Sequence, residues 1–323
     1  MTLSRRDTLK LFAGAAALAA LPALPARAAT SEFRIGWQKG GVFALAKAEG
    51  AIEKRLAPLG ITVSWNEFTS GPPLLEALGA NALDFGSTGD IPPLFAQSAG
   101  GDLLYVAATK GAIDGSAILV KQDSPIQSLA DLRGKKVAFK RGSSSHNFAV
   151  KALRTAGLGL GDVDALDLGP PDAAPAFATG QIDAWIIWDP YFAIAQQQPD
   201  TRVLVTTEGI VDSWGYYLAN GTFTKANPNV LVEVIDELAS VGARAQANLD
   251  DTVDDISKIT GVPVEIQKIA LTRKGADLGA IQPLDETILA YQQALADEFH
   301  DLGIIPKKLD IGSAFWYAPA VEG

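Results

Sequence analysis

The chain contains no cysteine among its 323 residues. Without thiols it can form neither disulfides nor thiolate zinc sites, and it has no cysteine nucleophile. It also lacks the lipidated cysteine that would tether an exported protein to a membrane. Histidine is nearly absent too, because only His146 and His300 occur and they lie far apart in the sequence. The composition therefore gives little support to a metal site.

Motifs for catalysis and nucleotide binding are missing as well. The chain has neither a Gly-x-Ser-x-Gly elbow nor a glycine-rich Walker loop. The run GLGLGD from Gly157 follows a helical segment rather than a strand, so it fails as a dinucleotide fingerprint. These absences predict a protein that binds without chemistry, is not an enzyme and uses no cofactor.

Positive charge is scarce, with 27 lysines and arginines against 37 aspartates and glutamates and a net charge of -10. Such an acidic chain is a poor candidate for binding nucleic acid or an anionic membrane surface. A small anion is not excluded, because local hydrogen-bond donors suffice to hold it. The composition, 48% hydrophobic and 20% charged, is globular and provides for two domains.

The first 28 residues have the pattern of an export signal. A basic start with Arg5 and Arg6 precedes a short run of alanine and leucine, and the segment ends in Ala26, Arg27 and Ala28. The run is short and contains prolines, which argues against a membrane span. The SRRDTLK motif resembles a twin-arginine signal. We expect cleavage near Ala28 and a mature protein free in the periplasm.

After the leader, short β-type runs alternate with helical ones, which predicts parallel-rich sheets with crossover helices. One long helix is expected over residues 42–60, and the segment from Pro228 onward is almost purely helical. The motif Gly-Pro-Pro occurs at Gly71 and again at Gly169, each time before a helical stretch and a strand. Either two such units share turn chemistry by chance, or the protein has two lobes of like architecture facing each other.

The run GSSSHN, from Gly142 to Asn147, joins an expected strand to an expected helix. One serine would suffice as a helix N-cap, whereas three serines with His146 and Asn147 exceed that need. Backbone N–H groups and the helix dipole make such a terminus suitable for an anion. We favour an anion site, and a plain cap with solvated neighbours is the alternative.

A second run, FGSTGDIPP from Phe85 to Pro93, repeats this arrangement. Ser87, Thr88 and Gly89 would add donors, while Asp90 is expected to cap the following helix. Two further groups are aromatic. Trp188 and Tyr191 lie at the end of an expected strand, and Trp214, Tyr216 and Tyr217 lie in the run SWGYYLA. They are either core residues or the walls of a slot for an apolar tail.

These motifs resemble those of the solute-binding proteins of ABC importers for aliphatic sulfonates, within the nitrate, taurine and sulfonate group. The resemblance runs in order along the mature chain, through RIGWQKG (34–40), LLEALGANALDFGSTGDIPPLFAQSAG (74–100), SLADLRGKKVAFKRGSSSHNF (128–148), GQIDAWIIWDPYFA (180–193) and PKKLDI (306–311).

The resemblance implies an α/β, two-lobed type II periplasmic binding protein fold, with two parallel-rich sheets and a two-strand hinge. The crossings are expected near residues 116–122 and 214–219. Lobe one would comprise residues 31–119 and 216–323, and lobe two residues 120–215.

A sulfonate has three acceptor oxygens and no proton, so it suits a site made only of donors. Fourteen residues are expected to form the ligand site: Gln38, Gly71, Ser87, Thr88, Gly89, Ser143, Ser144, Ser145, His146, Asn147, Trp188, Asp189, Trp214 and Tyr216. A ligand anion beside His146 would favour its charged form, so binding is expected to tighten as the pH falls through the ordinary pKa of histidine, about 6.5.

The expected function is to capture aliphatic sulfonates between the lobes for uptake as a sulfur source. The expected partners are a small organic sulfonate and a membrane permease with its cytoplasmic ATPase, and the protein is expected to be a monomer. Two alternatives remain. One is a taurine or nitrate binder, in which Asp189 or Asp90 could hold the ammonium of taurine. The other is an enzyme on the same scaffold, similar to pyrimidine-synthesis proteins.

Overall fold

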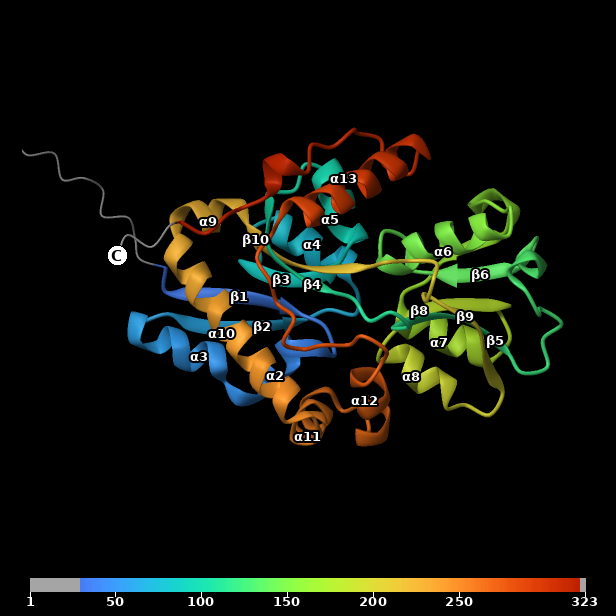
Figure 1. Ribbon diagram of the computed structural model, residues 1–323, viewed down its shortest axis with the longest axis horizontal. Coiled ribbons are helices and arrows are strands. Elements are labelled where there is room, and N and C mark those ends of the chain that lie inside the picture. The colour runs from blue at the N-terminus through green and yellow to red at the C-terminus, as the bar shows by residue number, and fades with distance from the viewer. Residues whose placement is uncertain (1–29, 320–323) are drawn as a thin grey trace, which may run out of the picture. The chain divides into compact units, whose positions relative to one another are not determined.

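The computed structural model describes residues 30–319, so the expected leader lies outside the described residues. The chain from Glu32 onward belongs to one compact unit. Its strands form two five-stranded sheets, each covered by helices, as expected for a two-lobed α/β fold (Figure 1).

The first sheet has the order β2-β1-β3-β10-β4. Its strands are β1 (Glu32–Trp37), β2 (Thr62–Glu67), β3 (Phe85–Gly89), β4 (Leu103–Lys110) and β10 (Trp214–Asn220). Strand β1 pairs in parallel with β2 and β3, whereas β10 runs antiparallel to both β3 and β4.

Helices cover both faces of this first sheet. The first face packs against α2 (Gly41–Glu49), α3 (Ala51–Leu56), α10 (Pro228–Ala247) and α11 (Leu249–Thr260). The second face packs against α4 (Gly71–Gly79), α5 (Ile91–Ser98) and α13 (Glu286–Asp301). A short helix, α9 (Gly221–Ala226), follows β10. The single helix expected over residues 42–60 is divided, because Gly50 adopts a left-handed conformation that ends α2 and precedes α3.

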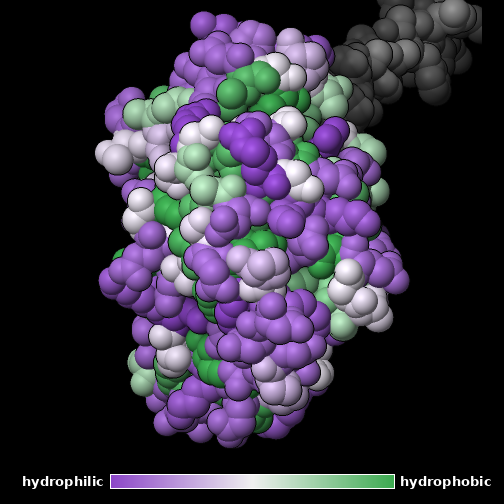
Figure 2. Space-filling model, turned by 90° about the vertical axis from the view of Figure 1, so that its right-hand side faces the viewer, coloured by the Kyte–Doolittle hydropathy of each residue, from purple (hydrophilic) through white to green (hydrophobic). Residues whose placement is uncertain are grey.

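The second sheet has the order β7-β6-β8-β5-β9. Its strands are β5 (Ser116–Lys121), β6 (Lys136–Phe139), β7 (Asp164–Asp167), β8 (Ala184–Trp188) and β9 (Thr201–Thr206). Helix α6 (Ser144–Thr155) packs on one face, and α7 (Pro170–Ala178) and α8 (Tyr191–Gln196) pack on the other. On the side of the protein seen in Figure 2, hydrophilic residues predominate and hydrophobic ones form separate small areas.

The two sheets share one topology. In each, three neighbouring strands are parallel, the third of these along the chain is central, and the strand on its other side, β10 or β5, is antiparallel to it. The two Gly-Pro-Pro motifs occupy equivalent places, because Gly71 begins α4 before β3 and Pro170 begins α7 before β8. The weak repeat therefore reflects two lobes of like architecture.

The chain crosses between the sheets twice, through residues 111–115 and 207–213. These segments touch, since the N–H of Gly111 donates to the carbonyl of Ser213 at 3.0 Å. The strands expected at the crossings, β5 and β10, each lie wholly within one sheet. We propose that the lobes divide within these two connecting segments, a few residues from the boundaries predicted at 119/120 and 215/216.

The C-terminal part of the chain returns to the second lobe before it ends on the first. Helix α12 (Val264–Leu271) contacts α8, and the segment after it runs beside the crossing segments. There the N–H of Ile113 donates to the carbonyl of Lys274 at 2.8 Å, and the N–H of Gln282 donates to Ala108 of β4 at 2.9 Å. This segment thus connects both lobes.

Candidate functional site

A cavity of about 400 Å³ lies between the two lobes. Ten of the fourteen predicted site residues line it. The first lobe contributes Gln38, Gly71, Ser87, Thr88 and Gly89, and the second lobe contributes Ser143, Ser144, Trp188 and Asp189. Trp214, the first residue of β10, completes the set.

Strand ends and helix starts bring these residues together. Ser87, Thr88 and Gly89 form the carboxyl end of β3, and Ser143 and Ser144 lie where the chain leaves β6 and enters α6. Ligands in open α/β sheets bind beyond the carboxyl ends of the strands. The lobes approach closely here, because a Cβ added to Gly89 would lie 1.9 Å from the Ser144 hydroxyl oxygen. A larger residue at position 89 would require the Ser144 hydroxyl to rotate away or the lobes to separate.

The serine run does not act as a helix cap. Ser143 occupies the N-cap position of α6, yet its side chain makes no capping hydrogen bond. Instead its hydroxyl donates to the carbonyl of Lys140 at 2.7 Å and lies 2.8 Å from the hydroxyl of Ser145. Helix α4 likewise starts at the cavity without a side-chain cap at Ser70. The positive ends of these helices are therefore not neutralised by their own caps.

Two donors of the first lobe are held by backbone carbonyls. The side-chain amide of Gln38 donates to the carbonyl of Ser87 at 3.2 Å, and the hydroxyl of Thr88 donates to the backbone carbonyl of Gly89 at 3.1 Å. Thr88 is only 6% exposed. These contacts fix the positions of both side chains, and an anion in the cavity would offer their hydrogens an alternative acceptor.

Ser145 and His146 do not line the cavity. Both are buried, because successive helical residues turn away from the face that carries Ser144. The ring of His146 stacks on Phe139 with centroids 5.2 Å apart, and its Nδ1 accepts from the N–H of Gly142. Burial lowers the pKa of His146 to about 4, and Arg141 adds to this. The expected tightening of binding through protonation of His146 therefore has no structural basis.

Asn147 and Tyr216 also lie outside the cavity, beneath its floor. The amide nitrogen of Asn147 donates to Oδ2 of Asp90 at 2.9 Å, which joins the two lobes through a buried hydrogen bond. Tyr216 is fully buried and meets Tyr105 edge to face, with centroids 5.0 Å apart. Asn147 therefore contributes to the contact between the lobes, and Tyr216 to the packing within the first lobe.

Asp90 is not the expected N-cap of α5, since its side chain makes no capping bond. Its carboxylate accepts from Asn147 and from the hydroxyl of Tyr291 at 2.9 Å. Burial raises the pKa of Asp90, and hydrogen bonding by Tyr291, Ser144 and Asn147 opposes that rise. Asp90 thus links β3 of the first lobe with α6 of the second.

The carboxylate of Asp189 faces an arginine that the sequence did not indicate. Arg273 contacts it with Nε at 2.7 Å and with a terminal nitrogen at 3.2 Å, and the guanidinium lies 3.9 Å from the ring centroid of Phe192. Burial raises the pKa of Asp189, while the hydrogen bonds and charge of Arg273 lower it. Both side chains are nearly buried, at 14% and 10% exposure. Asp189 is therefore a paired carboxylate at the edge of the cavity.

Several lining residues were missed by the sequence analysis, among them Lys39, Gly40, Gly41, Ala112, Ser213 and Ala270. Most have small side chains and carry no chemical signal in a sequence. Lys39 lies in the RIGWQKG run directly after Gln38, and this position is the sequence feature that could have indicated it as a lining residue. Ala270 and Arg273 come from the helical C-terminal part, where no motif suggested a site.

Within residues 30–319, no group of three or more acidic, histidine or cysteine side chains could hold a metal ion. None of the helices in this range is both long and apolar enough to span a membrane.

Comparisons with known proteins agree with this fold. The family model described as NMT1/THI5 like matches residues 58–240. An aliphatic sulfonates-binding protein of Escherichia coli strain K12 is 38% identical over 299 residues, which cover 92% of each chain.

Two solved structures are similar over nearly their whole length. The alkanesulfonate-binding protein SsuA from Xanthomonas axonopodis pv. citri, bound to MOPS, has a TM-score of 0.85 and 34% identity, and the match covers 90% of this chain and 99% of that one. The periplasmic aliphatic sulphonate binding protein SsuA from Escherichia coli has a TM-score of 0.79 and 38% identity, covering 91% and 94%. These relatives are binding proteins and not enzymes, and they share the periplasmic binding protein fold. The chain therefore belongs to the NMT1/THI5-like family and to the family of aliphatic sulfonate-binding proteins.

Proposed function

We propose that this protein captures organic sulfonates in the cavity between its lobes, as the solute-binding component of an ABC importer. One observation carries the proposal: hydroxyl and N–H donors of both lobes line one cavity, and the single carboxylate among its described lining residues is paired with Arg273. The names of the similar proteins, which include aliphatic sulfonate and alkanesulfonate binding, support the same ligand class.

A sulfonate suits this arrangement because it is fully ionised and has three acceptor oxygens. Ser87 and Thr88 can donate from one side, and the backbone N–H groups at the start of α6 can donate from the other, where the Ser144 hydroxyl can also turn from Asp90 to the ligand. The dipoles of α4 and α6 favour a negative charge between them. Lys39 adds a partly exposed positive charge at the rim. No bound cation is needed to hold such a ligand.

Taurine fits this cavity less well than a sulfonate without an amine. Its ammonium group would need a free carboxylate, whereas Asp189 is engaged by Arg273 and Asp90 lies buried beneath the cavity. Nitrate would satisfy the donors but leave most of a cavity of this size unfilled. An alkyl or aryl sulfonate therefore uses both the donors and the space.

The proposal extends to location and partners. The leader pattern of residues 1–28 and the word periplasmic in the name of the E. coli relative support export with cleavage near Ala28. A permease with a cytoplasmic ATPase would then receive the ligand, and the protein would act as a monomer. Intact-mass measurement of protein from its native host tests export, because a retained leader would contradict it.

Calorimetric titration with a short alkanesulfonate tests the binding site. Replacing Ser144 by alanine removes a hydrogen bond to a charged group, so we expect the dissociation constant to rise at least about tenfold. Ser145→Ala is the matched control, because its hydroxyl points to Ser143 and not into the cavity, and we expect a clearly smaller change. Equal effects of the two substitutions, or none, would show that the serines do not hold the anion.

A further inference from the structure

The carboxyl group of Asp90 lies beneath the ligand cavity and is completely buried. Its Oδ2 accepts two hydrogen bonds of 2.9 Å, one from the side-chain amide of Asn147 and one from the hydroxyl of Tyr291. Its Oδ1 is buried as well, but no donor among residues 30–319 has hydrogen-bonding geometry toward it. The Ser144 hydroxyl is near enough to interact with this carboxyl and also lines the cavity. Asp90 is therefore an incompletely bonded group next to a ligand donor.

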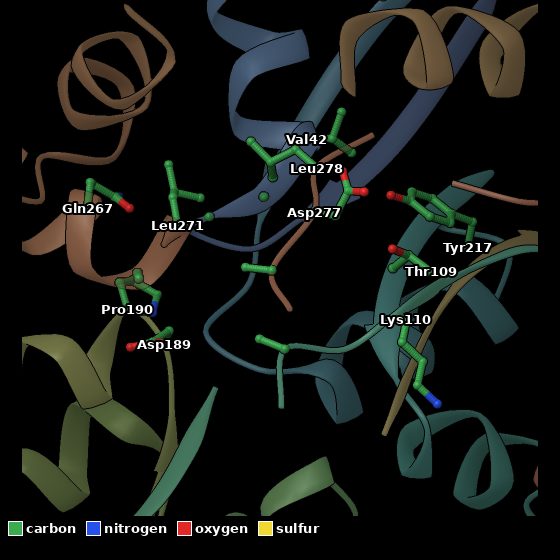
Figure 3. A pocket seen from close by; sticks show the side chains of 15 residues that line it. Val42, Thr109, Lys110, Asp189, Pro190, Tyr217, Gln267, Leu271, Asp277 and Leu278 are labelled. Atoms are coloured by element: carbon green, nitrogen blue, oxygen red, sulfur yellow. The ribbon is translucent and has the colours of Figure 1, made fainter. Parts of the chain in front are cut away.

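Two other carboxylates with little exposure are paired with arginine. Asp84 is 2% exposed and contacts Arg34 at 2.7 Å. Asp189, which also lines a smaller cavity beside α12 (Figure 3), contacts Arg273 at 2.7 Å. In the part of the chain that the structure describes, Asp90 has no such partner, because its hydrogen bonds come from an amide and a hydroxyl. A buried charge without a partner is unfavourable, so a neutral carboxyl group is expected here.

The side chains that face Asp90 from the neighbouring elements are uncharged. Three tyrosines approach it, Tyr105 of β4, Tyr216 of β10 and Tyr291 of α13, and burial raises the pKa of each, so that all three remain neutral. Helix α6 contributes the neutral amide and hydroxyl described above. Strand β3 and helix α5, which flank Asp90 in the chain, contain no ionisable residue.

Charged residues farther along these elements are paired with one another. Lys151 of α6 contacts Glu298 of α13 at 2.9 Å, and Lys110 of β4 contacts Asp212 at 2.6 Å. Neither lysine therefore neutralises Asp90. Burial accordingly raises the pKa of Asp90, and its hydrogen bonds oppose that rise without reversing it.

The hydroxyl of Ser144 has a single hydrogen and can donate it only once. An ionised Asp90 would attract that hydrogen and leave the oxygen lone pairs facing a bound anion. A neutral Asp90 with its proton on Oδ1 would instead donate to Oγ of Ser144, and the Ser144 hydrogen would then point into the cavity. The neutral acid thus makes Ser144 a donor for the ligand and removes a negative charge beneath it.

We propose that Asp90 is a positioning residue of the ligand site. When a sulfonate is bound, one proton from solvent occupies Oδ1 of Asp90, this neutral acid donates to Oγ of Ser144, and Ser144 donates to the ligand. Asn147 and Tyr291 hold the carboxyl through Oδ2, which leaves Oδ1 for the proton. The inference rests on the proposed function, because it takes Ser144 as a donor to the bound sulfonate.

Infrared difference spectroscopy tests for the proton directly. The unchanged protein, saturated with a short alkanesulfonate at neutral pH, should show the carbonyl stretch of a protonated carboxylic acid, and Asp90→Asn should lack it. Asp189→Asn is the matched control, because it removes a carboxylate that is paired with Arg273 and should keep the band. A sulfonate-bound protein without the band, or a band that persists in Asp90→Asn, would overturn the inference and leave the proposed function standing. Failure of every alkanesulfonate to bind would instead contradict the proposed function.

Tyr291→Phe serves if Asp90→Asn folds poorly. It removes a hydrogen bond to Oδ2, the carbonyl oxygen of the neutral acid, so it should shift the band to higher frequency. An unshifted band would belong to another carboxyl group and would overturn the inference.

The pH profile of affinity tests what the proton does. Because the complex holds the proton more tightly than the free protein, the dissociation constant should rise as the pH increases from the pKa of Asp90 in the free protein toward its higher pKa in the complex, by up to about tenfold per pH unit. Asp90→Asn keeps a neutral donor beside Ser144, so it should bind the sulfonate and lose this dependence. Calorimetry from pH of about 5 to about 9 gives both profiles, and His146, with a pKa of about 4, stays neutral throughout. The same profile in both proteins would show that Asp90 serves only in packing and would overturn its positioning role.

Discussion

His146 illustrates how the surroundings of a residue decide its role. In the sequence it stands within a run of polar residues, yet in the structure its ring lies among Phe139, Phe95 and Phe299. Burial keeps the imidazole neutral down to a pKa of about 4, well below the value of about 6.5 expected in the unfolded chain. A group with a depressed folded pKa of this kind binds its proton more readily when the protein unfolds.

The sign of the resulting pH effect follows from linkage. Between pH values of about 6.5 and 4, the unfolded chain binds more protons at His146 than the folded chain, so acid lowers the free energy of unfolding. The contribution is fully present above pH of about 6.5. From these two pKa values, the loss at a pH of about 5 is about 2 kcal/mol.

We therefore predict that His146→Gln loses this pH dependence. Asp90 and Asp189 have raised pKa values and act in the opposite direction, so the comparison must be made between the variant and the unchanged protein. Denaturant unfolding of the ligand-free proteins at pH of about 7.5 and about 5 provides it. The difference in free energy of unfolding between the two proteins should shift by about 2 kcal/mol between these conditions. A constant difference would contradict a buried neutral imidazole.

At the scale of elements, helix α6 makes a row of contacts with the first lobe. Ser144, Asn147, Lys151 and Arg154 follow one another at intervals of three and four residues and so share one helix face. Ser144 meets the cavity, Asn147 meets Asp90, and Lys151 and Arg154 both contact Glu298 of α13. A ligand bound at the start of α6, as we propose, would lie at one end of the face that joins the lobes.

The close approach of β3 and α6 yields a second prediction. Gly89→Ala would place a methyl group 1.9 Å from the present position of the Ser144 hydroxyl oxygen. The backbone at residue 89 does not have a positive φ, so it is compatible with alanine. The ligand-free protein should remain folded with its lobes slightly apart, and sulfonate binding should weaken by about fivefold or more.

Gly161→Ala is the control for this change, because a Cβ there meets no atom within 4 Å and the residue does not line the cavity. Calorimetry and thermal unfolding of both variants provide the measurements. Unchanged affinity in Gly89→Ala would mean that the ligand is held without this approach of the lobes.

The sequence predicted most elements and many residues of the candidate cavity for physical reasons. Polar runs after apolar strands had to lie at strand ends, and the equivalent edges of two sheets brought Ser87 and Ser144 to one cavity. The prediction that all of Ser143–Asn147 bind the ligand was too broad, because the run enters a helix and only its first residues face the cavity. The division of the long helix at Gly50 depended on a left-handed conformation that glycine permits but does not require.

At the scale of the whole molecule, contacts between distant segments could not be predicted from the sequence. Arg273 and Asp189 are 84 residues apart, and nothing local in either segment indicates the pair. A cavity of about 230 Å³ forms likewise where α2, β4 and α12 meet, and the glycines and alanines that line it have no recognisable pattern in the sequence. Such features follow only from the packed structure.

The Arg273–Asp189 pair gives a third prediction. Arg273→Gln leaves a nearly buried carboxylate without its cation, so we expect a loss of about 3 kcal/mol in the free energy of unfolding and weaker sulfonate binding through charge repulsion. The double variant with Asp189→Asn removes that charge and should regain most of the affinity. Thermal unfolding and calorimetry of the three proteins test this, and a double variant no better than Arg273→Gln would refute the role of the charge.

The central claim is that the cavity is built of donors for a singly charged anion that carries no proton. A phosphonate of equal tail either brings a P–OH group, which finds no obligate acceptor among the serine, threonine and N–H groups, or takes a second charge close to buried Asp90. A buried donor without a partner costs about 1–3 kcal/mol.

Competition calorimetry with hexanesulfonate and hexylphosphonate at neutral pH tests this claim most directly. The sulfonate should bind at least about fivefold more tightly than the phosphonate. Equal affinity, or a preference for the phosphonate, would contradict the account of the ligand class and of the residues that hold it.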